Sequence, residues 1–356
     1  MDLLDLSKNC FSVLRQKAGE LLHRPLHRKP AEYLYILAEI MVDEQRDFDG
    51  ILLGSSFDPY PSIVEKFHNL GPKVYANSAE NFALARDILR VQKIAKESGF
   101  KVPETIPITN LSQLLDVARK QSFPLITRGE GGGGGHGIKI WENSQQLASH
   151  FEQREEFPEK LWIQEYIDGI DASASVICFE NFVNVLSINQ QLIGDKNLGA
   201  PGRFSYCGNI VPLDQKHIQK TLEEELLDSI KKLFQRLDLR GSNGIDFVIK
   251  DNEFFFMEIN PRFQGSLECV QFATRQNLVE LHLDSFHNNA PSSIPGKPKY
   301  YTTAVKGILF SNSEEKFQVI GYPKNKWIVD RTHLGVLLEY GDPFCSIVLS
   351  ANSAKR

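Results

Sequence analysis

Two apolar runs, residues 245–249 and 254–259, constrain the fold of this chain more than any other segment. They flank the polar triplet Asp251-Asn252-Glu253, an arrangement typical of a β-hairpin. Because successive side chains of a strand point to opposite faces, a three-residue loop at the triplet sets Asp246 across from Glu258. The other face then collects the bulky apolar side chains, namely Ile245, Phe247, Ile249, Phe255, Met257 and Ile259. A two-residue turn would put Asp246 on the wrong face, so we predict a three-residue or bulged turn.

The polar face of this hairpin carries oxygen ligands. Asp246, Glu258 and Asn260 share it, and Arg262 follows just past the second strand. Carboxylate and amide oxygens suit Mg2+ or Mn2+, which keeps some water and takes its remaining ligands from phosphates. Taken alone, the segment is equally consistent with a half-buried hairpin whose acids are solvated.

The composition is that of an ordinary globular protein, and it argues against several classes. The 356 residues are 42% hydrophobic and 24% charged, which is sufficient for two or three subdomains with their own cores. A net charge of -5 argues against nucleic acid as a partner. No apolar run approaches the roughly 18 residues of a membrane span, so we expect no membrane association and a cytoplasmic location. The five cysteines are scattered without a Cys-x-x-Cys pair and are expected to be reduced.

Helix and strand patterns divide the chain into three expected units, residues 1–103, 104–165 and 166–356. The first reads as a small α/β domain without the Gly-x-Gly-x-x-Gly turn of a dinucleotide site. The second contains a glycine-rich loop, and the third contains the hairpin and short C-terminal strands that close a sheet. Helices are expected at 1–24, 30–46, 78–96, 112–120 and 215–237, and strands at 51–54, 73–76, 123–128, 137–141, 161–167, 173–179, 182–189, 307–310 and 345–349.

A run of glycines joins two of the expected strands, between Arg128 and Gly137. Bare N–H groups and positive φ allow such a loop to fold over phosphates and to move as a lid, with Gly132, Gly133 and Gly134 at its centre. It is not a P-loop, because no Gly-Lys-Ser/Thr follows it. Arg128, at the end of its strand, can neutralise phosphate charge. The alternative is a plain linker.

A third segment, Gln164-Glu165-Tyr166-Ile167-Asp168-Gly169-Ile170-Asp171, completes an ordered set of motifs over roughly residues 77–289. Together the three resemble the ATP-grasp superfamily. The resemblance implies an α/β and α+β protein of the ATP-grasp fold, in which a small N-terminal α/β domain is followed by two lobes that clamp ATP. Taken alone, the third segment reads as an edge strand with a glycine turn.

The resemblance also implies a role for each motif position. Gln164 would face the adenine amine, Glu165 and Ile167 would offer backbone groups to adenine, and Asp171 would bind the ribose. Asp246 and Glu258 would hold two magnesium ions, with Asn260 completing one of them. Arg128 and Arg262 would act in catalysis, and Arg262 would contact the acyl substrate or phosphate.

More narrowly, the chain is similar to a group of carboligases related to biotin carboxylase, on Gln190–Asp195, Tyr206–Ile210 and Gly341–Cys345. It departs from the superfamily at two positions where a lysine is usual, now Ile88 and Arg128. Arginine keeps the charge but presents a planar fork. Contacts to the triphosphate must therefore be partly rebuilt, with Arg86, Lys196 or Arg203 as candidates.

The activity implied by the resemblance is an ATP-dependent carboxylate-amine ligase that forms an amide through an acylphosphate and releases ADP and phosphate. Its partners would be a small carboxylate and an amine, and a homodimer is compatible with it. Side chains after the first strand, at Ser55–Asp58, would help to select them. Two alternatives stay open: activation of bicarbonate, since Arg262-Phe263-Gln264 matches the Arg-x-Gln of biotin carboxylase, and a nucleotide-binding protein that has lost catalysis.

Overall fold

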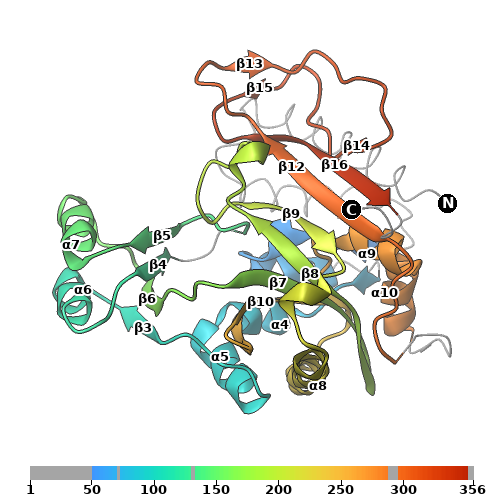
Figure 1. Ribbon diagram of the computed structural model, residues 1–356, viewed down its shortest axis with the longest axis horizontal. Coiled ribbons are helices and arrows are strands. Elements are labelled where there is room, and N and C mark those ends of the chain that lie inside the picture. Colours follow the sequence, from blue (N-terminus) through green and yellow to red (C-terminus); the bar gives the residue numbers. More distant parts are fainter. Residues whose placement is uncertain (1–49, 70–72, 130–132, 288–295, 352–356) are drawn as a thin grey trace.

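The computed structural model describes residues 50–69, 73–129, 133–287 and 296–351. The helices expected before residue 47 lie outside these ranges, as does Gly132. Figure 1 gives the arrangement of the elements, with a small lobe extending to the left of a larger body. No helix in the described part is long and apolar enough to cross a bilayer.

A small α/β unit begins the described chain. Its elements are β1 (Ile51–Leu52), the 3-10 turn η1 (Ser55–Phe57), α3 (Pro61–His68), β2 (Val74–Tyr75), α4 (Ala79–Arg86) and α5 (Ile88–Glu97). The two strands pair in parallel over a core that includes Ile63 and Phe67. The single helix expected at 78–96 is in fact two, because Asp87 leaves helical geometry (φ -79°, ψ 83°). Its carboxylate instead accepts a hydrogen bond from the Arg90 N–H and caps α5.

The small lobe is a four-stranded antiparallel sheet covered by two helices. Its strand order is β3 (Thr105–Ile108), β6 (Leu161–Glu165), β4 (Leu125–Gly129) and β5 (Ile138–Trp141). The helices are α6 (Leu111–Ala118) and α7 (Ser144–Glu152), each capped at its N-terminus by an asparagine side chain. Leu114 and Leu147 bury the inner faces of these helices against Ile163 of β6.

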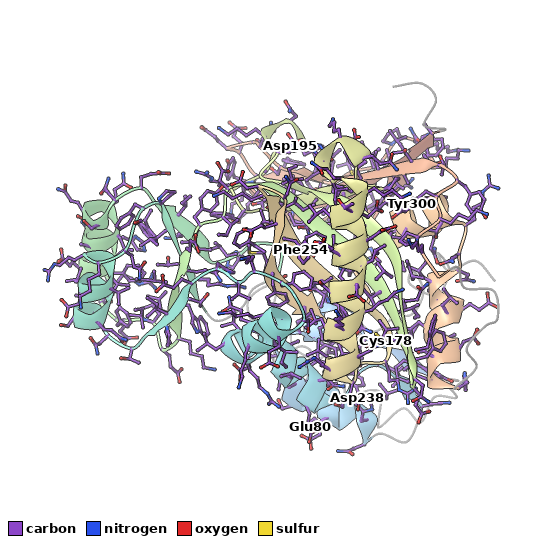
Figure 2. All side chains as sticks on the ribbon, turned by 60° about the horizontal axis from the view of Figure 1, so that its bottom comes forward. Glu80, Cys178, Asp195, Asp238, Phe254 and Tyr300 are labelled. Atoms are coloured by element: carbon purple, nitrogen blue, oxygen red, sulfur yellow. The ribbon has the colours of Figure 1, made fainter. Side chains whose placement is uncertain are left out.

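The body of the molecule is an eight-stranded sheet with helices on both faces. The strand order is β11 (Glu253–Asn260), β10 (Gly241–Lys250), β7 (Ile170–Phe179), β8 (Phe182–Ile193), β9 (Tyr206–Val211), β12 (Thr303–Phe310), β16 (Pro343–Ala351) and β14 (Ile328–Val329). One face packs on α8 (Lys220–Leu237), the khaki helix that crosses it in Figure 2. The opposite face packs on α9 (Leu267–Thr274) and α10 (Leu278–Phe286).

Short elements complete the chain. They are the 3-10 turns η2 (Lys196–Leu198) and η3 (Gln215–His217) and a two-stranded sheet of β13 (Phe317–Gln318) with β15 (Leu337–Leu338). The expected C-terminal strands, now β12 and β16, lie toward the edge of the large sheet.

The turn between β10 and β11 differs from the prediction. Lys250 pairs with Glu253, so the turn has two central residues, Asp251 and Asn252. Both have positive φ, 51° and 60°, as a type I′ hairpin turn requires. The three-residue loop predicted from the sequence is therefore wrong.

A β-bulge, rather than a longer loop, brings Asp246 and Glu258 to the same face of the hairpin. The register shifts at Met257, and this extra residue lets Glu258 pair with Asp246 on the polar face despite the two-residue turn. The shift also exchanges the residues of the core face. Phe254 and Phe256 are buried there, whereas Phe255 and Met257, which were expected in the core, are only half-buried.

Candidate functional site

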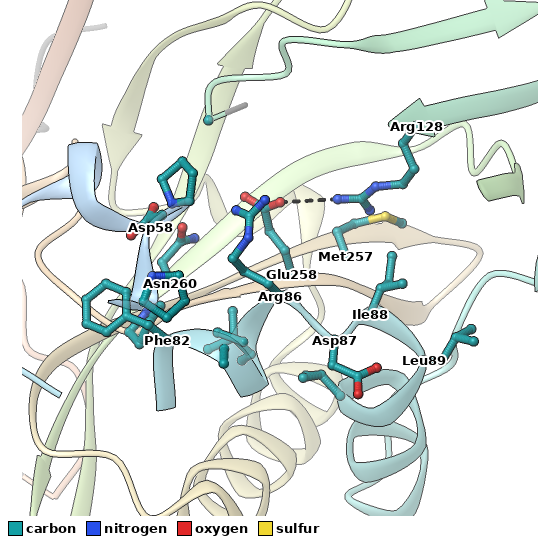
Figure 3. Close-up of a pocket in the computed structure, with 18 of the residues that line it drawn as sticks. Asp58, Phe82, Arg86, Asp87, Ile88, Leu89, Arg128, Met257, Glu258 and Asn260 are labelled. Atoms are coloured by element: carbon teal, nitrogen blue, oxygen red, sulfur yellow. Dashed lines mark ion pairs between the residues drawn. The ribbon is translucent and has the colours of Figure 1, made fainter. Parts of the chain in front are cut away.

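A cavity of about 540 Å³ lies where the N-terminal unit, the small lobe and the large sheet meet. Figure 3 looks into it. The N-terminal unit contributes the stretch from Phe82 to Leu89 together with Asp58, and the small lobe contributes Arg128 and the glycine loop. The end of β11, from Phe256 to Arg262, forms the third wall. Parts of the chain far apart in sequence thus share one cavity.

The hairpin acids Asp246 and Glu258 form a close pair, and Glu258 of this pair lines the cavity. Asp246 accepts hydrogen bonds from Gln191 Nε2 (3.0 Å) and Asn260 Nδ2 (3.1 Å). Burial and the neighbouring Glu258 carboxylate raise the pKa of Asp246 well above its usual range. Two carboxylates held together in this way repel each other until a cation or a proton is present. Within the described ranges, no three His, Cys, Asp or Glu side chains form a complete metal cluster.

Arg262 is held by an ion pair that crosses between two units. Its Nε and Nη2 donate to the Asp58 carboxylate at 2.7 to 3.2 Å, and its Nη2 also donates to Asn260 Oδ1 at 2.9 Å. The Nη1 group donates to the Phe263 carbonyl at 3.0 Å. Burial and Glu258 raise the pKa of Asp58, and Arg262 opposes this shift without cancelling it. Asp58 lies 204 positions from Arg262, so only the folded chain reveals the pair.

Basic side chains share the cavity with Glu258. Arg128 Nη2 lies 3.5 Å from Glu258 Oε2, the contact marked by the dashed line in Figure 3. Arg86 points into the same cavity beside Glu258, and Lys160 also lines it. Arg86 was one of three candidates for rebuilding the triphosphate contacts, whereas Lys160 was missed because nothing in its local sequence marks it.

The other two candidates lie elsewhere. Arg203 packs on the ring of Tyr166 at 5.1 Å and pairs with Glu142 at 3.7 Å. Lys196 begins the short turn η2, and neither residue is among those that line the cavity. Of the three proposed replacements for the missing lysine charge, only Arg86 borders the cavity.

The described part of the glycine loop borders the cavity. Gly133 and Gly134 line it, and the Gly134 carbonyl accepts a hydrogen bond from the Tyr206 N–H at 3.1 Å. Gly135 has a φ of 81°, and a Cβ atom there would lie 1.8 Å from the Phe204 carbonyl oxygen. Glycine is therefore required for the loop to dock on the segment that precedes β9.

The segment from Gln164 to Asp171 connects the small lobe to the large sheet. Gln164 is 1% exposed, and its Nε2 donates to Thr105 Oγ1 at 2.8 Å. Its Oε1 has no hydrogen-bond partner among the described residues. Gln164 shares a strand face with Trp162, which lines the cavity.

The remaining predicted residues of this segment do not line the cavity. The Glu165 N–H donates to the Glu104 carbonyl at 2.9 Å, and Glu165 pairs with Leu125 of β4. Ile167 is 6% exposed. Burial, and secondarily Asp168, raise the pKa of Asp171 to about 6. Gln164, Glu165, Ile167, Asp171 and Asp246 are not among the residues that line the cavity.

Comparisons with known proteins agree with this architecture. A family model described as an ATP-grasp domain matches residues 85–266. An uncharacterized protein of Methanocaldococcus jannaschii is 28% identical over 265 residues, 74% of this chain and 60% of that protein. The chain therefore spans less than two thirds of this relative.

Two solved structures are similar in fold. The biotin carboxylase domain of Hydrogenobacter thermophilus 2-oxoglutarate carboxylase, crystallised with MgADP and bicarbonate, has a TM-score of 0.74 at 15% identity and covers 91% of this chain and 75% of its own. The L-amino acid ligase of Bacillus licheniformis has a TM-score of 0.68 at 16% identity and covers 93% and 82%. At these identities the likeness confirms the expected fold and nothing finer.

Proposed function

The chain belongs to the ATP-grasp domain family, and we propose from this that it is an ATP-dependent carboxylate-amine ligase. In the proposed reaction a carboxylate oxygen attacks the γ-phosphorus of ATP, which gives an acylphosphate and ADP. An amine then attacks the acyl carbon and displaces phosphate, which leaves an amide.

The contact between Arg128 and Glu258 carries the proposal. It joins the small lobe to the metal-type hairpin across the cavity, at 3.5 Å, where a triphosphate and its cation would lie between the lobes. Their attraction without a ligand is modest, because the Glu258 side chain is 44% exposed. A cation at Glu258 and a phosphate at Arg128 would replace it with stronger, charge-assisted contacts.

The side chains fit ATP and Mg2+ at both ends of the proposed site. At the adenine end, Gln164 Oε1 is a buried acceptor without a partner in the described ranges, and the adenine amine is a matching donor. At the phosphate end, a divalent cation would relieve the repulsion between Asp246 and Glu258, and Asn260 Oδ1 keeps a second lone pair beside its bond to Arg262. Phosphate oxygens and water would supply the remaining ligands.

The residues of the chain divide the catalytic work. Arg128, Arg86 and Lys160 would bind and neutralise the phosphates, and Arg262 would orient the carboxylate toward the γ-phosphorus. The Gly133 and Gly134 segment, docked at Tyr206, would exclude water from the acylphosphate. Magnesium, when bound, would supply positive charge to the transferred phosphoryl group. No side-chain nucleophile is needed.

We further propose that the chain works as three units, residues 1–103, 104–165 and 166–356. The four-stranded and eight-stranded sheets would move as the two jaws of the cleft, and the first unit would supply the wall with Asp58 and Arg86. The expected small-molecule acid and amine would enter on the Arg262 side.

A screen for ADP release from the purified protein tests this function. We expect ADP and phosphate to form only with Mg2+ and a suitable acid, and product amide to require an amine as well. Dependence on bicarbonate in place of the acid would support the carboxylase alternative. Nucleotide binding with no turnover for any acid would support loss of catalysis. AMP formation in place of ADP would contradict all three.

A further inference from the structure

Arg262 has little capacity left for a substrate. A guanidinium has five N–H groups. In the described structure the Nε–H and one Nη2–H bind Asp58, the second Nη2–H binds Asn260 Oδ1, and one Nη1–H binds the Phe263 carbonyl. One N–H is left over, and a single N–H cannot form the two parallel bonds by which arginine recognises a carboxylate.

Asp58 occupies the edge of the guanidinium that such a carboxylate would need. Its two oxygens contact Nε and Nη2 in a side-on, bidentate arrangement at 2.7 to 3.2 Å. At the other edge of the guanidinium, Nη1 donates to the backbone carbonyl of Phe263, which cannot rotate away as a side chain can. Bidentate capture of an acid by Arg262 therefore requires Asp58 to leave.

We infer that Asp58 is an internal stand-in for the carboxylate of the acid substrate at Arg262. This inference deepens the proposed function, on which it rests, by assigning the Nε and Nη2 edge of Arg262 as the substrate's carboxylate site. Asp58 lies on the cavity wall, and its side chain is 19% exposed against 11% for Arg262.

The anchoring of Asp58 permits the exchange. Its backbone is held by the η1 turn through an N–H bond to the Ser55 carbonyl, and the adjacent Phe57 is buried. The three hydrogen bonds that its carboxylate accepts from Arg262 are the contacts that rotation of the side chain breaks. Glu258 repels this carboxylate, so its pairing is imperfect. One carboxylate then replaces another on the same cation, with little net change in charge.

Competition by Asp58 weakens the apparent affinity for the acid. The acid can bind only while Asp58 is away from Arg262, so its affinity is reduced by the fraction of time that the site is free. If Asp58 fills the site about nine-tenths of the time, the affinity for the acid falls about tenfold. Removing the charge of Asp58 should restore this factor. A residue that binds the substrate directly, or that merely positions Arg262, would have the opposite effect.

Chemical modification of Arg262 by phenylglyoxal, mapped by peptide mass spectrometry, tests the inference without turnover. We compare the wild type with Asp58→Asn and with the control Asp87→Asn. Asp87 lines the same cavity and caps helix α5 by accepting a hydrogen bond from the Arg90 N–H, and asparagine caps a helix equally well. The control thus removes one cavity charge and leaves Arg262 paired. Modification of Arg128 in the same digests serves as the internal reference.

We expect Arg262 to react about tenfold faster in Asp58→Asn than in Asp87→Asn, and malonate, the carboxylate probe, to protect it at an about tenfold lower concentration. Equal rates and equal protection in the two variants, or weaker protection in Asp58→Asn, would overturn the inference. If Asp58→Asn does not fold, Asp58→Ser is read in the same way. A negative ADP screen would leave this result untouched, so the two failures are distinguishable.

Discussion

Asp246 and Glu258, the proposed metal ligands, repel each other because both are carboxylates. Burial and mutual repulsion raise the pKa of Asp246, so the two charges together are a local cost to the fold. Asn260 and Gln191 offset part of this cost by hydrogen bonding to Asp246. A site that is unfavourable without a cation is what the proposed magnesium function requires.

We predict that Asp246→Asn and Glu258→Gln each abolish Mg2+-dependent ADP formation and change the free energy of unfolding by less than about 1 kcal/mol. The fold tolerates them because each removes one of two repelling charges. Thermal unfolding with ADP, with and without Mg2+, checks this independently of turnover. Saturating ligand at 100 Kd stabilises the wild type by about 2.7 kcal/mol, and the part due to Mg2+ should vanish in both variants. Full activity in both would remove the metal assignment.

Asp171 is another carboxylate with a raised pKa, and its titration should make the stability of the fold depend on pH. Its pKa is about 6 in the folded protein, against about 3.9 in an unfolded chain. Between these values the folded state binds more protons than the unfolded state, so the free energy of unfolding falls as pH rises from 4 to 6. Asp171→Asn should remove the part of this slope that Asp171 contributes and be more stable than wild type at pH 7.5, by up to about 3 kcal/mol.

Urea unfolding of the two proteins at pH 4.5 and pH 7.5 measures this difference. The same variant should bind ATP more weakly, because the proposed ribose acceptor is lost. A stability difference that does not change with pH would show that Asp171 titrates normally.

At the scale of elements, periodicity predicted most strands but missed two local irregularities. The pairing of Asp246 with Glu258 follows from face alternation and was confirmed. The predicted turn length was wrong. Face alternation requires one extra residue between Asp246 and Glu258 but does not say whether the turn or a bulge supplies it, and here the bulge at Met257 does. The break at Asp87 was missed because an aspartate can cap a helix or lie within one, and packing decides which.

The glycine loop gives a prediction with a control in the same loop. Gly135 and Gly137 both have φ of 81°, but a Cβ at Gly135 would collide with the Phe204 carbonyl, whereas Gly137 has open space around it. Gly135→Ala should therefore raise the KM for ATP about tenfold or more beyond Gly137→Ala, which has only the backbone strain. Steady-state kinetics of both variants separates the effect of lost docking on Phe204 from the effect of backbone strain alone. Equal KM values would make the loop a linker.

At the scale of the molecule, the sequence predicted the type of fold, and part of the predicted site residues gather at one cavity, but it did not predict how the walls of that cavity meet. Motifs in order along the chain indicated Arg128, Glu258, Asn260 and Arg262, which line one cavity. The contribution of the first unit was foreseen only as Arg86, a candidate for the triphosphate contacts, and as help from the segment around Asp58. Its pairing with Arg262 crosses 204 positions and has no local signal, because such contacts are set by the packing of whole units.

The central claim is that this cavity binds ATP together with Mg2+ between the two lobes. Calorimetric titration of ATP into the purified protein, once with Mg2+ and once with a chelator, tests it most directly. We predict a single site whose affinity falls at least about tenfold without Mg2+, which corresponds to about 1.4 kcal/mol. The Glu258→Gln variant should lose that difference. No binding of ATP, or equal affinity with and without Mg2+, would contradict the account.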